Sequence, residues 1–245
     1  MKLIFNADDF GMTKGAVYGT LDAYKNGVVR STTMLANGHA FDLAVQMAKE
    51  NPGLDIGVHL ALTFGSPVLK DLKTLVNYEG KFYRNIDELT QNAPDFSLEE
   101  VEREFTAQIE KIKAAGIPFT HFDVHHLLEP HIYEVEHRLA EKYGVSVRRS
   151  LPDVDYKRLK TPDLFLNDFY GEGVTMTTIR KIVEAYKHTD QVVEIMTHPA
   201  FMDEELLGLS SYSDIRMKEV TLLTSKELQN YLAQENVTLA SFRDL

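Results

Sequence analysis

The feature that most constrains the fold of this chain is the regular alternation of short apolar runs with amphipathic helical patterns. Runs typical of buried strands occur at Lys2–Asn6, Ser31–Leu35, Leu54–Leu60, Phe119–Val124, Val145–Arg148, Val192–Met196 and Val237–Ala240. Patterns typical of helices lie between them, at Lys14–Asn26, Phe41–Glu50, Ser97–Ala115, His131–Tyr143, Thr177–His188 and Ser225–Gln234. Strands that alternate with helices favour a parallel sheet covered by helices.

The number of strands favours an α/β fold that is a barrel or an incomplete barrel rather than a small open sheet. A chain of 245 residues fits one barrel domain, so we expect a single domain over residues 1–245. The stretch Thr63–Phe96 breaks the alternation, because it is long, weakly periodic and rich in glycine and proline. Long irregular segments in enzymes often cover a site, and we expect part of Thr63–Phe96 to overhang the functional centre.

The longest predicted helix, Ser97–Ala115, carries a start signal and an acidic run. The sequence Ser97-Leu98-Glu99-Glu100 predicts a capping box, in which Ser97 and Glu100 each bind a backbone N–H of the other. The acidic run Glu99–Glu104 is expected to form a solvated helix face. We therefore assign no functional role to this helix.

Composition excludes several classes of partner. The formal net charge is −11, which argues against nucleic acid or an anionic membrane as the main partner. The chain contains no cysteine, so thiolate chemistry and disulfides do not apply. No secretory apolar segment opens the chain and no apolar run reaches the roughly 18 residues of a membrane span, so we expect a cytoplasmic protein. Homodimers are the commonest oligomers, and a homodimer is the default expectation.

Polar residues stand at the ends of four predicted strands. Asp8 and Asp9 follow the first strand, His59 lies in the third, "THFDVHH" spans Thr120–His126, and His198 lies in "EIMTHPA". Active sites of parallel barrels lie at the carboxyl ends of the strands. Two adjacent buried carboxylates repel each other, and burial penalises each further. A divalent cation bound by Asp9, with Asp8 beside it, explains why both are present, because imidazoles and carboxylates are its common ligands.

Strand alternation bears on which histidine of the pair His125-His126 faces this centre. His121, Asp123 and His125 share one side of the strand, whereas His126 lies on the other. If the polar set points inward, His125 faces the metal, although the turn at the strand end leaves His126 as the alternative. Asp123 is interpreted as a partner that orients a metal ligand rather than as a ligand itself.

The chain resembles the YdjC-like family, whose best-known members are chitooligosaccharide deacetylases. The resemblance rests on "NADDFG" at Asn6, "GVHLALT" at Gly57, "PFTHFDVHH" at Pro118, "THP" at Thr197 and the closing "ASFRDL". It implies an irregular or incomplete barrel related to polysaccharide deacetylases, and metal-dependent removal of an acetyl group from an N-acetylated sugar.

The family motifs also imply a role for each site residue. By their positions in the motifs, Asp9, His59 and His125 would be the metal ligands, with Mg²⁺ usually assigned although Zn²⁺ suits this ligand set. Asp8 would be the catalytic base and His198 the acid. Amide hydrolysis needs an activated water and a protonated leaving amine, and these residue types suit both requirements.

Other interpretations of the same residues remain open. Asp8-Asp9 could form a turn with a helix cap, His59 could be a hydrogen-bonded core histidine, and His198 could make only a loop contact. A metal-dependent phosphoesterase is an alternative function, but phosphate sites need Arg or Lys near the metal, and the four motifs contain neither. A non-catalytic sugar-binding protein is a third possibility. The presence of both Asp8 and His198 argues against it.

Overall fold

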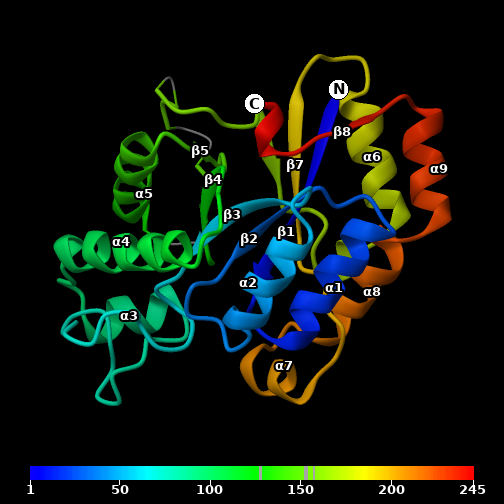
Figure 1. Cartoon of the computed structure of the whole chain (residues 1–245). Helices are drawn as coiled ribbons and strands as arrows, with labels where there is room; N and C mark the ends of the chain where they lie inside the picture. The colour runs from blue at the N-terminus through cyan, green and yellow to red at the C-terminus, as the bar shows by residue number, and fades with distance from the viewer. Residues whose placement is uncertain (127–128, 152–153, 157) are drawn as a thin grey trace.

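The computed structural model describes residues 1–126, 129–151, 154–156 and 158–245, and strands alternate with helices along most of the chain (Figure 1). The strands are β1 (Lys2–Phe10), β2 (Ser31–Met34), β3 (Asp55–Leu60), β4 (His121–Val124), β5 (Ser146–Val147), β6 (Leu164–Leu166), β7 (Val192–Thr197) and β8 (Thr238–Leu239). The helices are α1 (Lys14–Lys25), α2 (Phe41–Glu50), α3 (Ile86–Asn92), α4 (Leu98–Ala114), α5 (Pro130–Tyr143), α6 (Met176–Tyr186), α7 (Glu204–Leu209), α8 (Asp214–Leu223) and α9 (Lys226–Gln234), with short 3-10 helices η1 (Gly171–Gly173) and η2 (Phe242–Asp244).

The strands form one parallel sheet that does not close. Its order is β5-β4-β3-β2-β1-β7-β6, and β8 pairs with β1. β5 and β6 end this path, and within the described residues no pairing joins them. The prediction of an α/β fold with an incomplete barrel is therefore confirmed. Both chain termini lie at the end of the sheet where β1 begins, at the top of Figure 1.

Burial explains why the strands read as apolar runs. Every residue of β1 from Leu3 to Phe10 is buried, as are all residues of β2, β3 and β4. Strands of a parallel sheet covered on both faces lose the alternating polar face of an exposed sheet. Polar side chains in these strands are therefore exceptions that need partners, because a buried polar group without one is costly.

Helix α1 packs unusually close to the segment that follows β7. A Cβ atom on Gly15 would lie 2.0 Å from the carbonyl oxygen of Phe201, and one on Gly19 would lie 2.5 Å from Cα of Ala200. The N–H of Phe201 also donates to the carbonyl of Gly15 at 2.9 Å. Only glycine permits this approach, and it fixes the backbone just after the "THP" motif.

The irregular segment Thr63–Phe96 follows β3 and lies at the end of the sheet where the strands finish, at the lower left of Figure 1. It is not wholly irregular, because it contains the short helix α3. Two carboxylates of α4 hold its backbone. Glu104 accepts from the N–H groups of Val68 and Leu69, and Glu100 accepts from that of Thr74.

These contacts correct two expectations about α4. Glu100 and Glu104 are buried, so the acidic run is not a solvated face throughout. Ser97 does cap the helix by accepting from the N–H of Glu100. The Glu100 carboxylate binds the neighbouring segment instead of Ser97, whose N–H donates to Thr74, so the predicted capping box forms only in part.

Elsewhere the predicted elements agree with the structure to within a few residues, except in the C-terminal half of the chain. The sequence analysis did not predict β6, α7 or α8.

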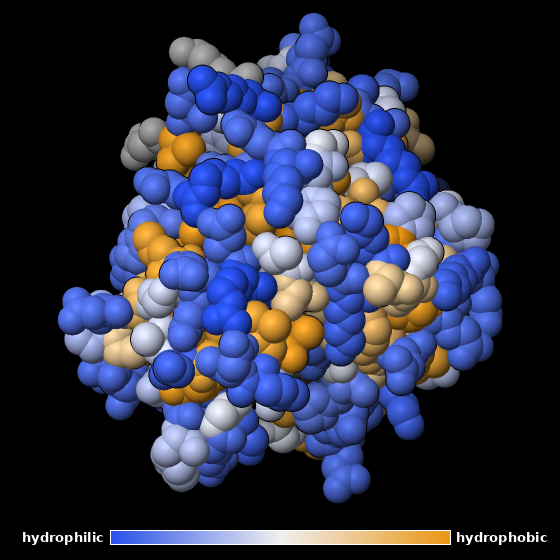
Figure 2. Space-filling model, turned by 60° about the vertical axis from the view of Figure 1, so that its left-hand side comes forward, coloured by the Kyte–Doolittle hydropathy of each residue, from blue (hydrophilic) through white to orange (hydrophobic). Residues whose placement is uncertain are grey.

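The surface around α4 and α5, which comes forward in Figure 2, is mostly hydrophilic with small apolar patches between charged side chains. Within the described part of the chain, no helix has both the length and the apolar character needed to cross a lipid bilayer.

Candidate metal centre and active site

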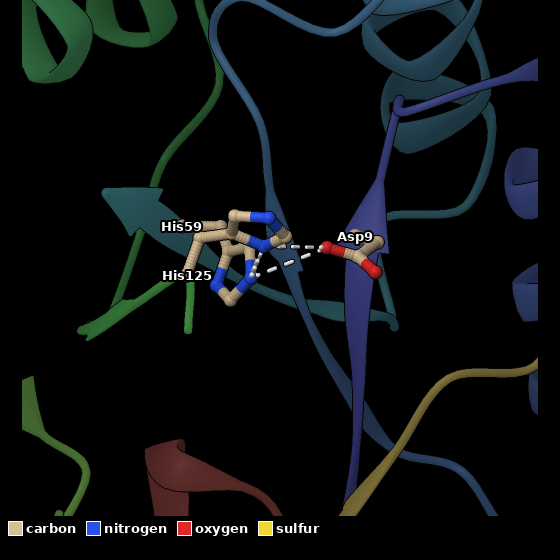
Figure 3. A group of neighbouring side chains, drawn as sticks. All are labelled: Asp9, His59 and His125. Carbon is tan, nitrogen blue, oxygen red and sulfur yellow. Dashed lines mark hydrogen bonds and ion pairs between the residues drawn. The ribbon is translucent and has the colours of Figure 1, made fainter. Parts of the chain in front are cut away.

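The polar residues at the strand ends converge at one end of the sheet. Asp8 and Asp9 lie near the end of β1, His59 lies near the end of β3, and His125 directly follows β4. Because these strands are parallel and closely spaced in the sheet, their carboxyl ends meet. Figure 3 shows the Asp9 carboxylate facing the two imidazoles across a short gap.

Three buried atoms form a nearly equilateral triangle at this point. Asp9 Oδ1 lies 3.3 Å from His59 Nε2 and 3.1 Å from His125 Nδ1, and the two nitrogens are 3.2 Å apart. Atoms that each lie ~2.0–2.2 Å from one ion are separated by roughly 3.0–3.5 Å, so this spacing fits a shared divalent cation. Asp9 Oδ1 is buried and has no donor in hydrogen-bonding geometry among the described residues. The structure thus brings the three predicted ligands together as a candidate metal site.

An irregular backbone allows two adjacent aspartates to serve one centre. Consecutive side chains of a regular strand point to opposite faces. Here Asp9 has a φ of +69°, and the pairing of β1 with β2 shifts its register between Ala7 and Phe10. Such a bulge re-aims a side chain, and aspartate is one of the few residues that adopts positive φ readily. Both carboxylates consequently lie beside His59.

His59 is oriented by the carboxylate of Asp123. The Nδ1 atom of His59 lies 2.6 Å from Asp123 Oδ1, and Thr33 donates to the other oxygen of Asp123 at 2.9 Å. This leaves Nε2 of His59 directed at Asp9, the arrangement in which a second carboxylate orients a metal-binding imidazole. Burial lowers the pKa of His59, but the carboxylates of Asp123, Asp9 and Asp8 outweigh this effect and raise the pKa to about 10.

The two adjacent histidines have different environments. His125 is buried and belongs to the group of close ligand atoms, and the ring of Phe64 lies 5.8 Å from its ring. His126 has a φ of +65° and is exposed, with Nδ1 3.0 Å from the hydroxyl of Thr63. The geometry therefore favours His125 over His126 as a ligand. The contacts from Thr63 and Phe64 also place the start of the irregular segment beside the cluster.

Asp8 is held by an arginine that the sequence analysis did not single out. The buried Arg148, just after β5, binds both oxygens of the Asp8 carboxylate at 2.7 and 2.8 Å. Its guanidinium also lies 3.0 Å from Asp123 and 2.8 Å from Glu194. Burial raises the pKa of Asp8, but the charge and hydrogen bonds of Arg148 outweigh burial and lower the pKa to about 2.

Two more buried carboxyl groups lie behind this network. Glu194 in β7 hydrogen-bonds Arg148, yet burial still raises its pKa to about 7. Glu136 on α5 is fully buried and neither of its oxygens has a hydrogen-bond partner among the described residues. Burial and the nearby Asp123 charge raise the pKa of Glu136 well above its ordinary value.

Asp9 is held from the other side by Arg216 of α8. Arg216 Nη2 donates to Asp9 Oδ2 at 2.8 Å, and its Nε donates to the carbonyl of Tyr212 at 2.7 Å. The two oxygens of Asp9 thus have separate roles, because Oδ2 is bound by arginine while Oδ1 faces the imidazoles. Burial raises the pKa of Asp9, but Arg216 and His125 lower it well below its ordinary value.

His198 lies beside the cluster, in the loop after β7. Its backbone N–H donates to the carboxyl of Glu219, and its ring packs edge-on against Tyr170 and Tyr212, each at 5.7 Å. The side-chain atom Nδ1 is buried without a hydrogen-bond partner in the described structure. Burial lowers the pKa of His198, and the charge of Arg216 lowers it further, to about 4, although Asp8 and Asp9 act in the opposite direction.

The two arginines differ in how far the sequence could reveal them. Arg148 ends the run Val145–Arg148, so a rule that polar residues at strand ends belong to the site could have included it. Arg216 gave no such signal, because α8 was not predicted and Arg216 is separated from Asp9 by most of the chain.

Comparison with known proteins gives whole-length matches. The family model described as YdjC-like protein matches residues 2–234. A protein of Listeria monocytogenes named carbohydrate deacetylase is 60% identical over 245 residues and is covered completely, as is this chain. A protein of the same name from Brevibacillus brevis is 42% identical over 252 residues, again with 100% of both chains covered.

Solved structures share the fold. A structure from Enterococcus faecalis V583, described as that of a candidate cellobiose-phosphate cleavage protein, has a TM-score of 0.93 and 33% identity over 99% of this chain and 98% of its own. The Bc1960 peptidoglycan N-acetylglucosamine deacetylase has a TM-score of 0.52 and 14% identity over 98% of this chain and 85% of its own. The latter likeness confirms the predicted relation to polysaccharide deacetylases at the level of the fold.

Proposed function

Because the chain belongs to the YdjC-like family, we propose that it is a metal-dependent enzyme that removes the acetyl group from an N-acetylated sugar or short oligosaccharide, such as an acetylated chitooligosaccharide. Relatives that match it over their whole length are named carbohydrate deacetylase, and the chain is an enzyme of this class. The observation that carries the proposal is the buried triangle of Asp9 Oδ1, His59 Nε2 and His125 Nδ1.

In this proposal Asp9, His59 and His125 hold the divalent cation. Family resemblance favours Mg²⁺, whereas two imidazoles and one carboxylate suit Zn²⁺ equally well. When bound, the cation polarises the acetyl carbonyl and lowers the pKa of a water molecule. Asp123 keeps Nε2 of His59 turned toward Asp9 Oδ1, where the cation would bind, and Arg216 occupies the oxygen of Asp9 that faces away from the imidazoles.

Asp8 and His198 are proposed as base and acid. Asp8 accepts the proton of the attacking water, the carbonyl carbon gains a C–O bond, and the C–N bond breaks to give acetate and an amine. His198 donates the proton that the leaving nitrogen needs. The free chain holds His198 neutral at pH 7, since its pKa is about 4. We therefore expect His198 to take up its proton in the substrate complex, where negative charge develops on the reacting amide.

The phosphoesterase alternative gains one argument from the structure. The four sequence motifs contain no arginine, but Arg148 and Arg216, which lie outside them, are both beside the cluster. The lack of arginine in the motifs therefore argues less strongly against a phosphoesterase. Arg148 donates to carboxylates through both Nη atoms. Arg216 donates through Nη2 to Asp9 and through Nε to the carbonyl of Tyr212. Only Nη1 of Arg216 lacks a partner in the described structure, and it is buried. Two engaged guanidiniums support a site for a neutral amide better than one for a phosphate dianion.

The deciding experiment is turnover by the metal-loaded enzyme. N,N′-diacetylchitobiose and N-acetylglucosamine are compared with a panel of sugar phosphates, with acetate and inorganic phosphate measured as products. Release of acetate alone is expected. Release of phosphate alone would replace this proposal with a phosphoesterase, and binding without turnover of either class would favour a sugar-binding protein.

The proposed base is tested by one variant in the same assay. Asp8→Asn should retain the metal, because Asp9, His59 and His125 remain, but lose about 10²–10⁴-fold in kcat. Loss of the metal from Asp8→Asn would instead make Asp8 a ligand.

The proposal also includes one domain over residues 1–245, a cytoplasmic location and a homodimer. Light scattering of the purified chain tests whether the chain is a homodimer.

A further inference from the structure

Tyr170 is a large aromatic side chain left exposed beside the proposed acid. It precedes η1 in the loop that follows β6, and 47% of the residue is accessible to solvent. Its ring stacks on that of Tyr212, with centroids 4.2 Å apart and planes inclined by 10°. Both rings lie edge-on to His198 at 5.7 Å. One face of Tyr170 is therefore covered by Tyr212, and the rest of the ring is available next to the reacting group.

The contacts around this pair fix its position. The hydroxyl of Tyr212 donates to Glu219 Oε1 at 2.6 Å and accepts from the N–H of Gly171 at 3.2 Å. The N–H of Gly173 donates to the carbonyl of Tyr170 at 2.9 Å. Gly171 has a φ of +58°, which glycine adopts without strain. Tyr212 thus backs the Tyr170 ring and also holds the loop that carries it.

A preorganised, half-exposed tyrosine suits a ligand with one flat apolar face and polar edges. Tyrosine offers a rigid apolar surface at a small entropic cost, with a hydroxyl that remains in polar surroundings. A pyranose ring has such a face, formed by its axial C–H groups, while its hydroxyls project around the edge. The charges of Arg216, Glu219 and Asp9 act on the Tyr170 hydroxyl, so this residue lies within the electrostatic reach of the catalytic cluster.

We propose that Tyr170, supported by Tyr212, is the platform on which the sugar ring carrying the reacting acetamido group stacks. This inference rests on the proposed deacetylase function and names how that site recognises its substrate. The stack fixes the plane of the pyranose, and the edge-on position of His198 then sets which edge of the sugar meets the acid. Substrates without a pyranose ring lack this contact.

The test uses Tyr170→Ala, Tyr170→Phe and a matched control, Tyr18→Ala. Tyr18 on α1 is 48% exposed, close to the value for Tyr170, but has no ring contact with His198 among the described residues. With N,N′-diacetylchitobiose, Tyr170→Ala should raise KM about tenfold, the scale of one lost aromatic contact. Tyr170→Phe and Tyr18→Ala should stay near the wild-type KM, and metal content should be unchanged in all three.

Saturation-transfer NMR with the same disaccharide adds a readout that does not depend on turnover. Stacking on one face should enhance either H1, H3 and H5 or H2 and H4 of the bound β-glucosamine ring, but not both sets. This selectivity should persist in Tyr170→Phe and vanish in Tyr170→Ala. Face-selective enhancement that persists in Tyr170→Ala would overturn the stacking proposal. Enhancement spread evenly over both faces of the sugar in the wild type would also overturn it.

The two proposals fail in distinguishable ways. Face-selective binding without acetate release would leave the stacking platform in place and remove the proposed reaction. Acetate release with a KM that does not depend on Tyr170 would support the proposed reaction and reject the stacking platform. An absence of sugar binding by the metal-loaded wild type would reject both.

Discussion

Replacement of Arg148 by methionine should destabilise the chain strongly, and by an amount that depends on pH. The side chain of Arg148 has an exposed fraction of only 3%. Its guanidinium contacts Asp8, Asp123 and Glu194 within 3.0 Å. Methionine keeps much of the length and volume of the arginine stem but removes the charge. Three buried carboxyl groups then lose the positive charge of the guanidinium that they share.

The size of the effect follows from burial and from the pKa of Asp8. Removing one partner of a buried ion pair costs about 3–5 kcal/mol, because the other charge is left without compensation. The pKa of Asp8 falls from 3.8 to about 2 in the folded chain, which corresponds to about 2 kcal/mol of that stabilisation. Since the folded pKa is depressed, this contribution is present above pH 4 and is lost as pH falls through the folded pKa.

The pH dependence separates a lost charge from a lost packing contact. Without Arg148, burial raises the pKa of Asp8 above its unfolded value, and each unit of that rise costs about 1.4 kcal/mol at neutral pH. Protonation at pH 4 removes most of this penalty. The stability difference between wild type and Arg148→Met should therefore be smaller at pH 4 than at pH 7.

Urea denaturation of the metal-free chain at both pH values measures this difference, because bound metal would otherwise stabilise the folded state by mass action. Arg138→Met is the control, since the ion pair of Arg138 with Glu102 is 2.8 Å long but exposed, at 55% and 46%. It should cost less than about 1 kcal/mol. A loss below that size in Arg148→Met, or one of equal size at pH 4 and pH 7, would refute the assigned role of Arg148.

Three further predictions test other parts of the site. Metal binding should release a proton between pH 6 and 8, because the pKa of His59 is about 10 in the metal-free chain; titration calorimetry in buffers of different ionisation enthalpy counts that proton, and His59→Ala should release none. His198→Ala should slow acetamide substrates about 10²–10⁴-fold but activated acetate esters much less, since these need little protonation of the leaving group; equal losses would remove His198 from the acid's role. Gly57→Ala should cost about 1–3 kcal/mol by overpacking, because the new Cβ would lie 2.5 Å from His121 Nε2, whereas Gly208→Ala, which meets nothing within 4 Å, should be nearly neutral in the same melts.

The sequence predicted those parts of the fold and site that depend on local patterns. Apolar runs between helical patterns predicted β1 to β4 with errors of a few residues, because buried parallel strands are continuous in their apolar character. The rule that parallel strands end at a common site then placed Asp9, His59 and His125 together.

The missing parts depend on contacts between distant segments. Helix α8 has both exposed and buried ionisable residues and little amphipathic pattern. Its two buried ionisable residues, Arg216 and Glu219, contact Asp9 near the end of β1 and His198 just after β7 rather than the apolar core. Glu100 and Glu104 looked solvated for a similar reason, since their partners are backbone N–H groups of the irregular segment. Periodicity counts charged residues as exposed and fails where a charge is buried with a partner.

The buried charges also indicate how this site behaves without its cation. Around the triangle, the carboxylates of Asp8, Asp9 and Asp123 face the guanidiniums of Arg148 and Arg216. The proton of His59, held with a pKa of about 10, supplies the third positive charge in the metal-free chain. A cation that binds at Nε2 must displace that proton, so metal and proton compete for one position.

This competition predicts that loss of the metal does not unfold the chain. In zinc fingers the ligands have no core to support them, and metal binding is the folding free energy. Here the ligands stand on strands of a buried sheet, and the His59 proton balances the cluster when no cation is bound. Chelation at pH 7 should therefore abolish activity while leaving the circular dichroism spectrum unchanged. Unfolding by chelator alone at pH 7 would show that the proton does not substitute for the metal.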